Sequence, residues 1–365
     1  MNEKSKSFKV GIVGSTGYTG VALIELLLKH PHFKIEVLTS ESYAGQKFSD
    51  IYPGFRGRVD NKLVKSSLNK LKSCDAIFFA TPNGIAHKLT PALIKAKKKV
   101  VDLSADYRFR DLKTYEKWYG FKRTNKADRE LNTETIYGLT EINREEIQEA
   151  VENGLSLIGN PGCYTTASIL ALAPILDFHA ASKTDLCDTS SIIIDAKSGV
   201  SGAGRKASVA TSYSELNESV SPYNLAGAHR HTPELETFFS EFTEEKIELS
   251  FSPHLMPMTR GLLATCYINI NPRAKMNDAK LKAIYTDFYG KTGKGEKFVE
   301  ILDKGIYPQT KWVVDTNNAI ISVHFDKKLN RAIITCAIDN LIKGAGGQAI
   351  QNMNLLFGMD DSVGF

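Results

Sequence analysis

The chain has 365 residues, of which 42% are hydrophobic and 24% charged, and a net charge of +5. This composition is typical of a globular protein, and the length exceeds what one hydrophobic core usually supports, so we expect two domains. The positive charges are spread along the sequence and no hydrophobic run approaches 18 residues, so we expect small anionic ligands, no nucleic acid and no membrane as partners.

The five cysteines are scattered and form no CxxC pair. This pattern argues against a disulfide framework and a structural zinc site, and we expect no metal. It favours a reducing compartment, which we take to be the cytoplasm. Residues 1–7 are polar, so we expect no signal peptide.

The N-terminal region predicts a βαβ unit. A buried strand is expected at Phe8–Val13, a helix at Val21–His30 and a second strand at Ile35–Leu38. The first strand and the helix are joined by Gly14-Ser15-Thr16-Gly17-Tyr18-Thr19-Gly20. Glycines in this position predict a dinucleotide-binding turn, whose phosphates face the helix N-terminus. A plain strand–helix turn is the alternative.

Each glycine of this turn has an expected role. Gly14 permits a tight turn, Gly17 lets the backbone approach a pyrophosphate, and Gly20 permits close packing. The second strand then ends at Thr39 and Ser40. Hydroxyl groups at this point can donate to a ribose 2′-phosphate, so the pattern favours NADP(H), whereas Glu41 would favour NAD if it turned back.

Two further buried strands are expected at Ala76–Ala80 and Val100–Leu103, with a helix at Ile85–Lys97 between them. Ligands of open α/β sheets bind at the carboxyl ends of strands. The candidates for the nicotinamide end are therefore Thr81, Asn83 and Ser104, although each of these residue types alone is more often a cap or turn residue. The basic and aromatic segment 107–137 is expected to be a structural excursion or a domain contact.

Cys163 lies between a strand-like run ending at Ile158 and a helical run starting at Ala167, in Gly159-Asn160-Pro161-Gly162-Cys163-Tyr164. The free N–H groups and the dipole of a helix N-terminus stabilise a thiolate. The position predicts a nucleophile, and the alternative is a buried, inert thiol.

The second half of the chain is rich in strands with longer connections, an α+β pattern. The expected elements are strands at Ser191–Ala196, Phe251–Leu255, Leu262–Ile270, Val313–Val314, Ala319–Phe325 and Arg331–Ile338, and a last helix at Ala349–Phe357.

Three polar motifs in this half suit an anionic substrate. The loop Lys197–Lys206 offers hydroxyls, backbone N–H groups and two cations at its end, with a flexible surface loop as the alternative. In Ala228-His229-Arg230-His231-Thr232-Pro233-Glu234, Thr232 is expected to cap a helix, and we expect one histidine to be the acid/base while the other orients substrate. The alternatives are two structural histidines, one capping and one packing, and a metal site, for which the sequence marks no third ligand. Arg260 suits a carboxylate or phosphate, with a surface ion pair as the alternative.

Four motifs together resemble the N-acetyl-gamma-glutamyl-phosphate reductase family of arginine biosynthesis. They are the glycine turn, the Cys163 motif, the histidine motif and Pro253-His254-Leu255-Met256-Pro257-Met258-Thr259-Arg260-Gly261. The resemblance runs from about Lys9 to the C-terminal helix. It implies an α/β fold with a Rossmann-type NADP-binding domain (1–160 plus 339–365) and an α+β catalytic and oligomerisation domain of the semialdehyde-dehydrogenase type (161–338).

The resemblance implies an oxidoreductase that reduces N-acetyl-L-glutamyl 5-phosphate with NADPH to the 5-semialdehyde, through a thioester on Cys163. His231 is our choice of general acid/base, with His229 second. The expected cofactor-binding residues are Gly14, Ser15, Thr16, Gly17, Tyr18, Thr19, Gly20, Ser40, Thr81, Ser104, Ser201, Gly202 and Asn340. The expected substrate-binding residues are Asn160, Arg205, Lys206, Glu234 and Arg260.

We expect a homo-oligomer, either a dimer or a tetramer. One departure from the family is Thr165, which stands where a proline is common. Three alternatives remain: a sister reductase of an aminoadipyl-type acyl phosphate, an aspartate-semialdehyde dehydrogenase, and a nucleotide-binding regulator without catalysis.

Overall fold

The computed structural model describes residues 7–182, 185–290 and 295–365. The chain forms two compact units, with residues 1–161 and 345–365 in unit 1 and residues 162–344 in unit 2. Residues 339–344, which we expected in the first domain, therefore belong to unit 2. The expectation that no signal peptide is present falls mostly on residues 1–6, outside the described residues.

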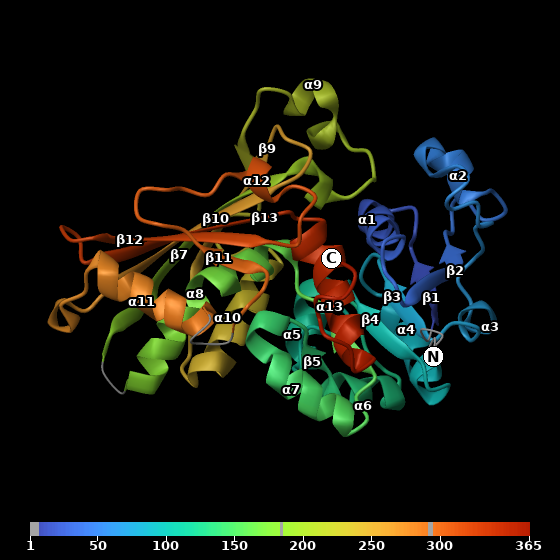
Figure 1. The fold of residues 1–365 in the computed structure, drawn as a ribbon, viewed down its shortest axis with the longest axis horizontal. Helices are drawn as coiled ribbons and strands as arrows, with labels where there is room; N and C mark the ends of the chain where they lie inside the picture. Colours follow the sequence, from blue (N-terminus) through green and yellow to red (C-terminus); the bar gives the residue numbers. More distant parts are fainter. Residues whose placement is uncertain (1–6, 183–184, 291–294) are drawn as a thin grey trace, which may run out of the picture. The chain divides into compact units, whose positions relative to one another are not determined.

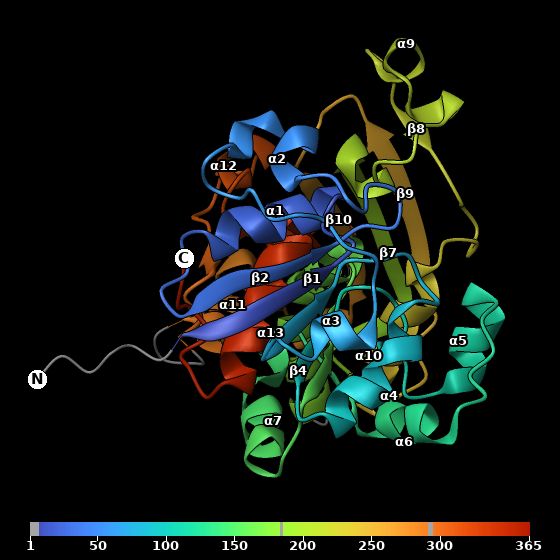
Figure 2. The ribbon, with the colours of Figure 1, turned by 90° about the vertical axis from the view of Figure 1, so that its right-hand side faces the viewer.

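Unit 1 is built on a six-stranded parallel sheet (Figures 1 and 2). The strands are β1 (Phe8–Val13), β2 (Phe33–Thr39), β3 (Ala76–Phe79), β4 (Lys99–Asp102), β5 (Ile136–Tyr137) and β6 (Leu157–Gly159). Their order is β2-β1-β3-β4-β6-β5. The order reverses between β1 and β3, and ligands of such sheets bind at the carboxyl ends of the strands beside a reversal.

Helices cover both faces of this sheet because successive strand residues point to opposite sides. Ile12 of β1 packs in a core with α1 (Tyr18–Leu27), α7 (Thr140–Glu152) and α13 (Gly347–Leu356). Val13 packs in a second core with α3 (Leu68–Leu71), α4 (Ala86–Lys95) and α6 (Lys126–Glu134). The C-terminal helix thus completes the sheet formed by the N-terminal part of the chain. The remaining helices of this unit include α2 (Phe48–Ile51) and α5 (Leu112–Tyr119).

Unit 2 contains a seven-stranded mixed sheet of order β11-β12-β13-β10-β7-β9-β8. The strands are β7 (Cys187–Gly199), β8 (Ser221–Pro222), β9 (Ser250–Met256), β10 (Leu262–Ile270), β11 (Val299–Ile301), β12 (Ala319–Asp326) and β13 (Arg331–Ile338). Every second residue of the central strand β10 is buried, from Leu262 to Ile270. This alternation follows the sequence and directs one face of the sheet toward helices.

The helices of unit 2 are α8 (Cys163–Ser182), α9 (Tyr213–Leu216), α10 (His231–Thr243), α11 (Asp278–Tyr289) and α12 (Thr310–Val313). Figure 1 shows α8, α10 and α11 on one side of the sheet. The hydroxyls of Tyr285 and Tyr289 on α11 donate to Ala171 O and Leu170 O of α8, at 2.6 and 2.9 Å. In Figure 2, α9 and β8 project beyond β9.

Two local expectations for this unit are wrong. Val313 ends helix α12 and does not lie in a strand. Two β-branched residues are too short a run to form a strand when the chain turns, and Thr316 N–H donates to Val313 O at 3.0 Å. Helix α10 begins at His231, so Thr232 lies in its first turn and is not the cap. The reason is that the His229 side chain accepts the His231 N–H at the helix start from outside.

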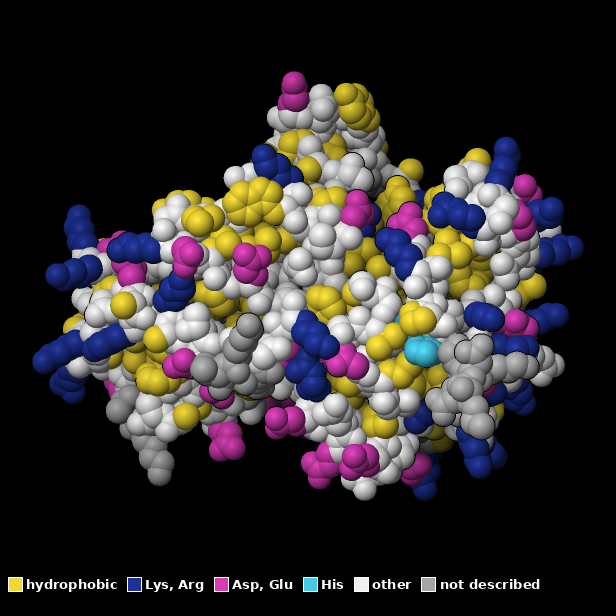
Figure 3. All heavy atoms as spheres, viewed as in Figure 1, with side chains coloured by type: hydrophobic (Ala, Val, Ile, Leu, Met, Phe, Trp, Pro, Cys, Tyr) yellow, Lys and Arg dark blue, Asp and Glu magenta, His cyan; other side chains and the backbone are white. Residues whose placement is uncertain are grey.

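Charged side chains are mixed on the surface. Lys and Arg lie scattered among Asp and Glu on the face drawn in Figure 3. Among the described residues, no helix is both long and apolar enough to cross a membrane.

Candidate active site

Cys163 is the first residue of α8. The first N–H groups of a helix have no acceptor within it, so they and the helix dipole favour negative charge at this end. The hydroxyls of Thr165 and Thr166 donate to Gly162 O at 2.7 and 2.9 Å, which fixes the entry into the helix. Cys163 is partly exposed, whereas the other four cysteines are buried. The predicted position of Cys163 is confirmed, and its reactivity stays a prediction.

Gly344 lies directly against the cysteine. A Cβ atom on Gly344 would come within 2.6 Å of Cys163 Cβ, so only glycine fits here. We did not predict this residue from the sequence, although the glycine-rich run Gly344-Ala345-Gly346-Gly347 was a signal of close approach.

Glu234 connects the start of α8 to helix α10. Its Oε1 accepts a hydrogen bond from Gly162 N–H at 3.1 Å and lies 2.9 Å from the Thr165 hydroxyl oxygen. The Glu234 side chain is buried, and its Oε2 lies 3.9 Å from His231 Nε2. We expected Glu234 to bind substrate. In the structure one of its oxygens is engaged with the Cys163 helix and the other faces His231, which is a positioning arrangement.

His231 is the more accessible of the two histidines, with 16% of its side chain exposed. It begins α10, and its ring lies 5.9 Å from that of Tyr164, the residue after Cys163. A carboxylate beside an imidazole stabilises the protonated ring. His231 therefore has the partner that a general acid/base needs.

His229 is buried in an aromatic enclosure. The ring centroids of Tyr164, Tyr223 and Phe251 lie 5.7, 5.4 and 5.1 Å from its own. Burial, and secondarily the Arg230 charge, lower the pKa of His229 to about 4. Its Nδ1 accepts the His231 N–H at 3.1 Å, so Nδ1 carries no proton and the ring is neutral. His229 thus holds the start of α10 in place.

Three expected cofactor-binding residues lie together in unit 2. Asn340 Nδ2 donates to Ser201 Oγ at 2.9 Å, and Asn340 Oδ1 accepts the Gly261 N–H at 2.9 Å. Gly202 lies beside them, since a Cβ atom there would be 3.7 Å from Asn340 Nδ2. The cluster joins the ends of β7, β10 and β13.

The three cations expected to bind substrate differ in their surroundings. Arg205 and Lys206 are exposed in the loop after β7. Arg260 forms an ion pair with Asp315, and its NH2 lies 3.1 Å from a carboxylate oxygen of buried Asp339. Arg260 therefore forms an ion pair, which was the alternative that we considered for it from the sequence. A substrate anion would have to share the Arg260 guanidinium with these aspartates.

In unit 1 the glycine turn is closed against β3. Gly14 has a positive φ of 83°, and a Cβ atom on it would come within 2.4 Å of Ala80 O. A Cβ atom on Gly20 would come within 2.6 Å of Gly14 O. Both positions require glycine, which confirms the tight turn and the close packing. They bring together the ends of β1 and β3, where the strand order reverses.

Gly17 caps α1, which begins at Tyr18, earlier than expected. The N–H groups of Tyr18 and Thr19 therefore lie in the first turn of this helix, where they have no acceptor within it. A Cβ atom on Gly17 would meet only Gly14 O, at 3.5 Å, so the space beside the Gly17 backbone is open. These features fit a phosphate group at the helix start.

Hydroxyl groups join the turn to the end of β2. Ser15 Oγ donates to Thr39 O at 2.9 Å, and Thr16 Oγ1 lies 2.9 Å from Ser40 Oγ. Ser15, Thr16 and Ser40 are all buried. The expected cofactor residues of this region thus form one hydrogen-bonded cluster at the ends of β1 and β2.

Glu41 does not turn back to these hydroxyls. Its Oε1 accepts the Ser66 N–H at 2.9 Å. Hydrogen bonding from Ser66 lowers the pKa of Glu41, so the carboxylate is ionised at neutral pH. The acid that would have favoured NAD is therefore engaged elsewhere.

Thr81 and Ser104 follow β3 and β4. Thr81 Oγ1 is enclosed and has no hydrogen-bond partner among the described residues. An enclosed hydroxyl without a partner costs about 1–3 kcal/mol, so a ligand group that bonds to it is favourable. Ser104 Oγ instead donates to Asp102 at 2.7 Å. Burial and the nearby Asp106 charge raise the pKa of Asp102 to about 7.

Asn160 is buried within unit 1. Its Oδ1 accepts a hydrogen bond from Asn352 Nδ2 of α13 at 2.9 Å, and its Nδ2 donates to Ala345 O at 3.3 Å. Because both ends of the amide have partners, the structure gives Asn160 a role in packing α13, where we expected substrate binding.

Arg108 Nε donates to Asn160 O at 2.7 Å, three residues before the cysteine. We did not predict this arginine from the sequence, where it follows Ser104 closely.

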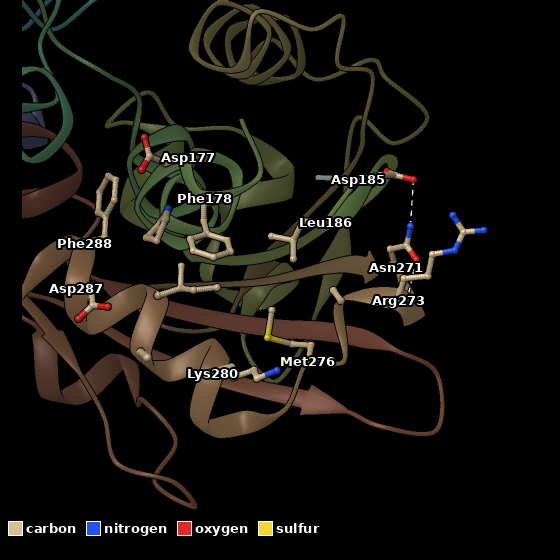
Figure 4. A pocket seen from close by; sticks show the side chains of 14 residues that line it. Asp177, Phe178, Asp185, Leu186, Asn271, Arg273, Met276, Lys280, Asp287 and Phe288 are labelled. Carbon is tan, nitrogen blue, oxygen red and sulfur yellow. Dashed lines mark hydrogen bonds between the residues drawn. The ribbon is translucent and has the colours of Figure 1, made fainter. Parts of the chain in front are cut away.

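A large cavity lies elsewhere in unit 2. It has a volume of about 1100 Å³ and is lined by residues of the second half of α8, of α11 and of the β10–α11 connection (Figure 4). None of the predicted site residues lines it. Roughly 16 Å of helix separates Cys163 from Pro174, the first α8 residue in its wall.

Comparison with protein families gives two matches. The family described as "Semialdehyde dehydrogenase, NAD binding domain" matches residues 9–150, and "Semialdehyde dehydrogenase, dimerisation domain" matches residues 163–340. Among curated proteins, the N-acetyl-gamma-glutamyl-phosphate reductase of Pelotomaculum thermopropionicum is 44% identical over 359 residues, 98% of this chain and 97% of that protein. The reductase of the same name from Synechocystis is 43% identical over 364 residues, 100% of this chain and 97% of that protein.

Solved structures share the fold. Aspartate semialdehyde dehydrogenase II of Vibrio cholerae, complexed with ASA, is similar with a TM-score of 0.71 and 17% identity, covering 97% of this chain and 99% of that chain. Aspartate semialdehyde dehydrogenase of Candida albicans with NADP has a TM-score of 0.66 and 18% identity, covering 96% and 99%. The fold class expected from the sequence is therefore confirmed.

Proposed function

Because the chain belongs to the N-acetyl-gamma-glutamyl-phosphate reductase family of semialdehyde dehydrogenases, we propose that it reduces N-acetyl-L-glutamyl 5-phosphate with NADPH. The products are N-acetyl-L-glutamate 5-semialdehyde and phosphate, and the reaction belongs to arginine biosynthesis. The observation that carries the proposal is the position of the Glu234 carboxylate. One of its oxygens accepts the Gly162 N–H beside Cys163, and the other faces His231.

Cys163 is the nucleophile in this proposal. Its thiolate attacks the acyl carbon, a C–S bond forms, and the C–O bond to phosphate breaks, which leaves a thioester. Helix-start N–H groups at Cys163 are suited to stabilise negative charge on the carbonyl oxygen. When bound, NADPH supplies the hydride that reduces the thioester.

His231 moves the proton. It takes the thiol proton of Cys163 before attack and returns it to the sulfur when the aldehyde leaves, while the Glu234 carboxylate stabilises the charged ring. His229 is the poorer candidate because its ring is buried and its Nδ1 is occupied by the His231 N–H. This supports our choice of His231 as the acid/base.

The residues of unit 1 suit NADP(H). The N–H groups of Tyr18 and Thr19 at the α1 start would hold phosphate oxygens, and Ser40 with Thr16 would donate to a 2′-phosphate. Thr81 Oγ1 would gain its missing partner from the nicotinamide end. We no longer propose Asn160 and Glu234 as direct substrate contacts, whereas Arg205 and Lys206 remain the cations that we propose for the phosphate.

The assembly and compartment are part of the proposal. Residues 163–340 match a dimerisation domain, and we propose that two or four copies assemble through unit 2. All five cysteines are free thiols, a state that persists in a reducing compartment, and we propose the cytoplasm.

The decisive experiment is the reverse reaction. Purified protein is given N-acetyl-L-glutamate 5-semialdehyde, NADP⁺ and inorganic phosphate, and NADPH formation is followed by absorbance. The proposal expects a rate that depends on phosphate. Aspartate semialdehyde and 2-aminoadipate semialdehyde are tested in parallel. A higher kcat/KM for either would replace the substrate assignment, and no rate with any aldehyde would favour a regulator without catalysis.

A further inference from the structure

The segment 107–137 has no role in the proposed reaction, yet it contains a buried ionic core. The side chain of Arg123 is fully buried and pairs with the equally buried carboxylate of Asp128. The guanidinium also lies 4.7 Å from the Tyr107 ring centroid and 5.4 Å from that of Tyr115. Burying such an ion pair costs several kcal/mol unless its geometry is good, so this core defines one arrangement of the segment.

Asp106 connects this core to the turn after β3. Arg123 donates to the backbone carbonyl oxygen of Asp106, and the Tyr115 hydroxyl donates to Asp106 Oδ1 at 2.7 Å. The same carboxylate accepts the Gly84 N–H at 2.7 Å and the His87 N–H at 3.2 Å. Asp106 therefore caps the start of α4, and Tyr115 and Arg123 of the buried core fix Asp106 itself.

Two further contacts fix the same turn. Asn83 Oδ1 accepts the Ala105 N–H at 2.9 Å. Gly84 has a φ of 82°, and a Cβ atom on it would come within 2.5 Å of the Phe121 ring. The Phe121 ring thus lies directly on the Gly84 backbone. Separate parts of the chain between residues 105 and 123 therefore converge on one short turn.

That turn begins with Thr81, whose enclosed hydroxyl has no partner among the described residues. The turn follows β3, and Gly14 of the dinucleotide turn packs against Ala80, the residue before Thr81. A shift of the Asn83–Gly84 backbone would therefore move Thr81 relative to the cofactor-binding turn.

We propose that Asp106 is a positioning residue for the cofactor, which, with Tyr115 and Arg123, fixes the Thr81–Gly84 turn against the nicotinamide half of NADPH. The inference rests on the cofactor role of Thr81 in the proposed function. It also accounts for the segment 107–137, which acts as a support that holds the cofactor turn from outside the sheet.

The test uses Asp106→Asn in the full-length protein. Asparagine has the same size, but its NH₂ group cannot accept from an N–H, so one of the two capping bonds is lost. The matched control is Asp75→Asn at the opposite end of β3, where the carboxylate accepts the Lys9 N–H at 2.9 Å, away from the Gly84 turn. Tyr115→Phe is a milder variant that removes only the hydroxyl bonded to Asp106.

Two ligands separate a local effect from a global one. The Kd of NADPH is measured by fluorescence, and the Kd of 2′,5′-ADP, which lacks the nicotinamide half, by calorimetry. Asp106→Asn should weaken NADPH binding about tenfold, the effect of one lost charge-assisted bond, and leave 2′,5′-ADP binding unchanged. Tyr115→Phe should give a smaller change in the same direction, and Asp75→Asn should change neither Kd.

Either of two results would overturn the proposal. One is wild-type NADPH affinity in both Asp106→Asn and Tyr115→Phe. The other is an equal loss of both ligands in Asp106→Asn and Asp75→Asn, which would show general destabilisation. If Asp106→Asn does not fold, Tyr115→Phe carries the test. Both Kd values are measured without acyl phosphate, so they test the positioning role even if the reaction proposed above is wrong.

Discussion

Glu234 Oε1 accepts the Gly162 N–H at 3.1 Å, while its Oε2 lies 3.9 Å from His231 Nε2. One buried carboxylate therefore joins the helix that begins at Cys163 to the helix that begins at His231. The distance between nucleophile and acid/base depends on a residue that contacts neither the acyl carbon nor the sulfur in our mechanism.

Glu234→Gln should lower kcat at least about tenfold, because the neutral amide no longer stabilises a protonated His231. The Kd of NADPH should not change, since cofactor residues in unit 1 are untouched. The control is Glu236→Gln on the same helix, where the carboxylate accepts the Leu249 N–H at 3.3 Å, away from Cys163 and His231. Wild-type kcat in Glu234→Gln would remove the carboxylate from the mechanism.

Cys163 should be the first thiol to react with iodoacetamide. The other four cysteines are buried, and burial raises the pKa of Cys74 to about 11 and of Cys187 to about 12. Intact-mass spectrometry of the native protein should show one carbamidomethyl group, and peptide mapping should place it on Cys163.

Cys163→Ser should abolish that labelling and reduce turnover to background, because a serine hydroxyl has no base strong enough to activate it in the same way. NADPH should still bind. Turnover close to that of the wild type would refute the thioester mechanism.

His231→Asn should lower kcat by about 100- to 10,000-fold, the usual contribution of a general acid/base, with little change in the Kd of NADPH. Steady-state kinetics of the forward and the reverse reaction measure this change in kcat. If His229→Asn is the crippling change and His231→Asn is mild, the roles of the two histidines are the reverse of those proposed here.

His229 should make folding stability depend on pH. Its pKa falls from 6.5 in the unfolded chain to about 4 in the fold, so the unfolded state binds the proton between these values and the folded state does not. The free energy of unfolding should be fully retained above pH 6.5 and fall as the pH decreases toward 4, by at most about 3 kcal/mol. Urea unfolding at several pH values measures this slope, which should flatten in His229→Gln. The same slope in both proteins would contradict the burial effect.

Much of the fold was predictable because its patterns are local. Glycine is the only residue that fits at positions 14 and 20, and the alternating residues of β10 indicate one buried face. Short elements were not predictable. The pair Val313–Val314 has strand propensity, yet it ends a helix because the chain turns there. Thr232 has the side chain of a helix cap, but the His229 ring, two residues before His231, takes the amide at the helix start.

The sequence by itself determined the dinucleotide turn, the helix start at Cys163 and the family, since each depends on residues that are neighbours in the chain. Only the tertiary structure decided what Glu234, Asn160 and Asp106 do. Their partners are distant in the sequence, and a buried polar side chain must find hydrogen bonds wherever the fold brings them. For that reason Glu234 and Asn160, which we expected to bind substrate, have structural partners instead: Glu234 accepts the Gly162 N–H beside Cys163, and Asn160 packs against α13.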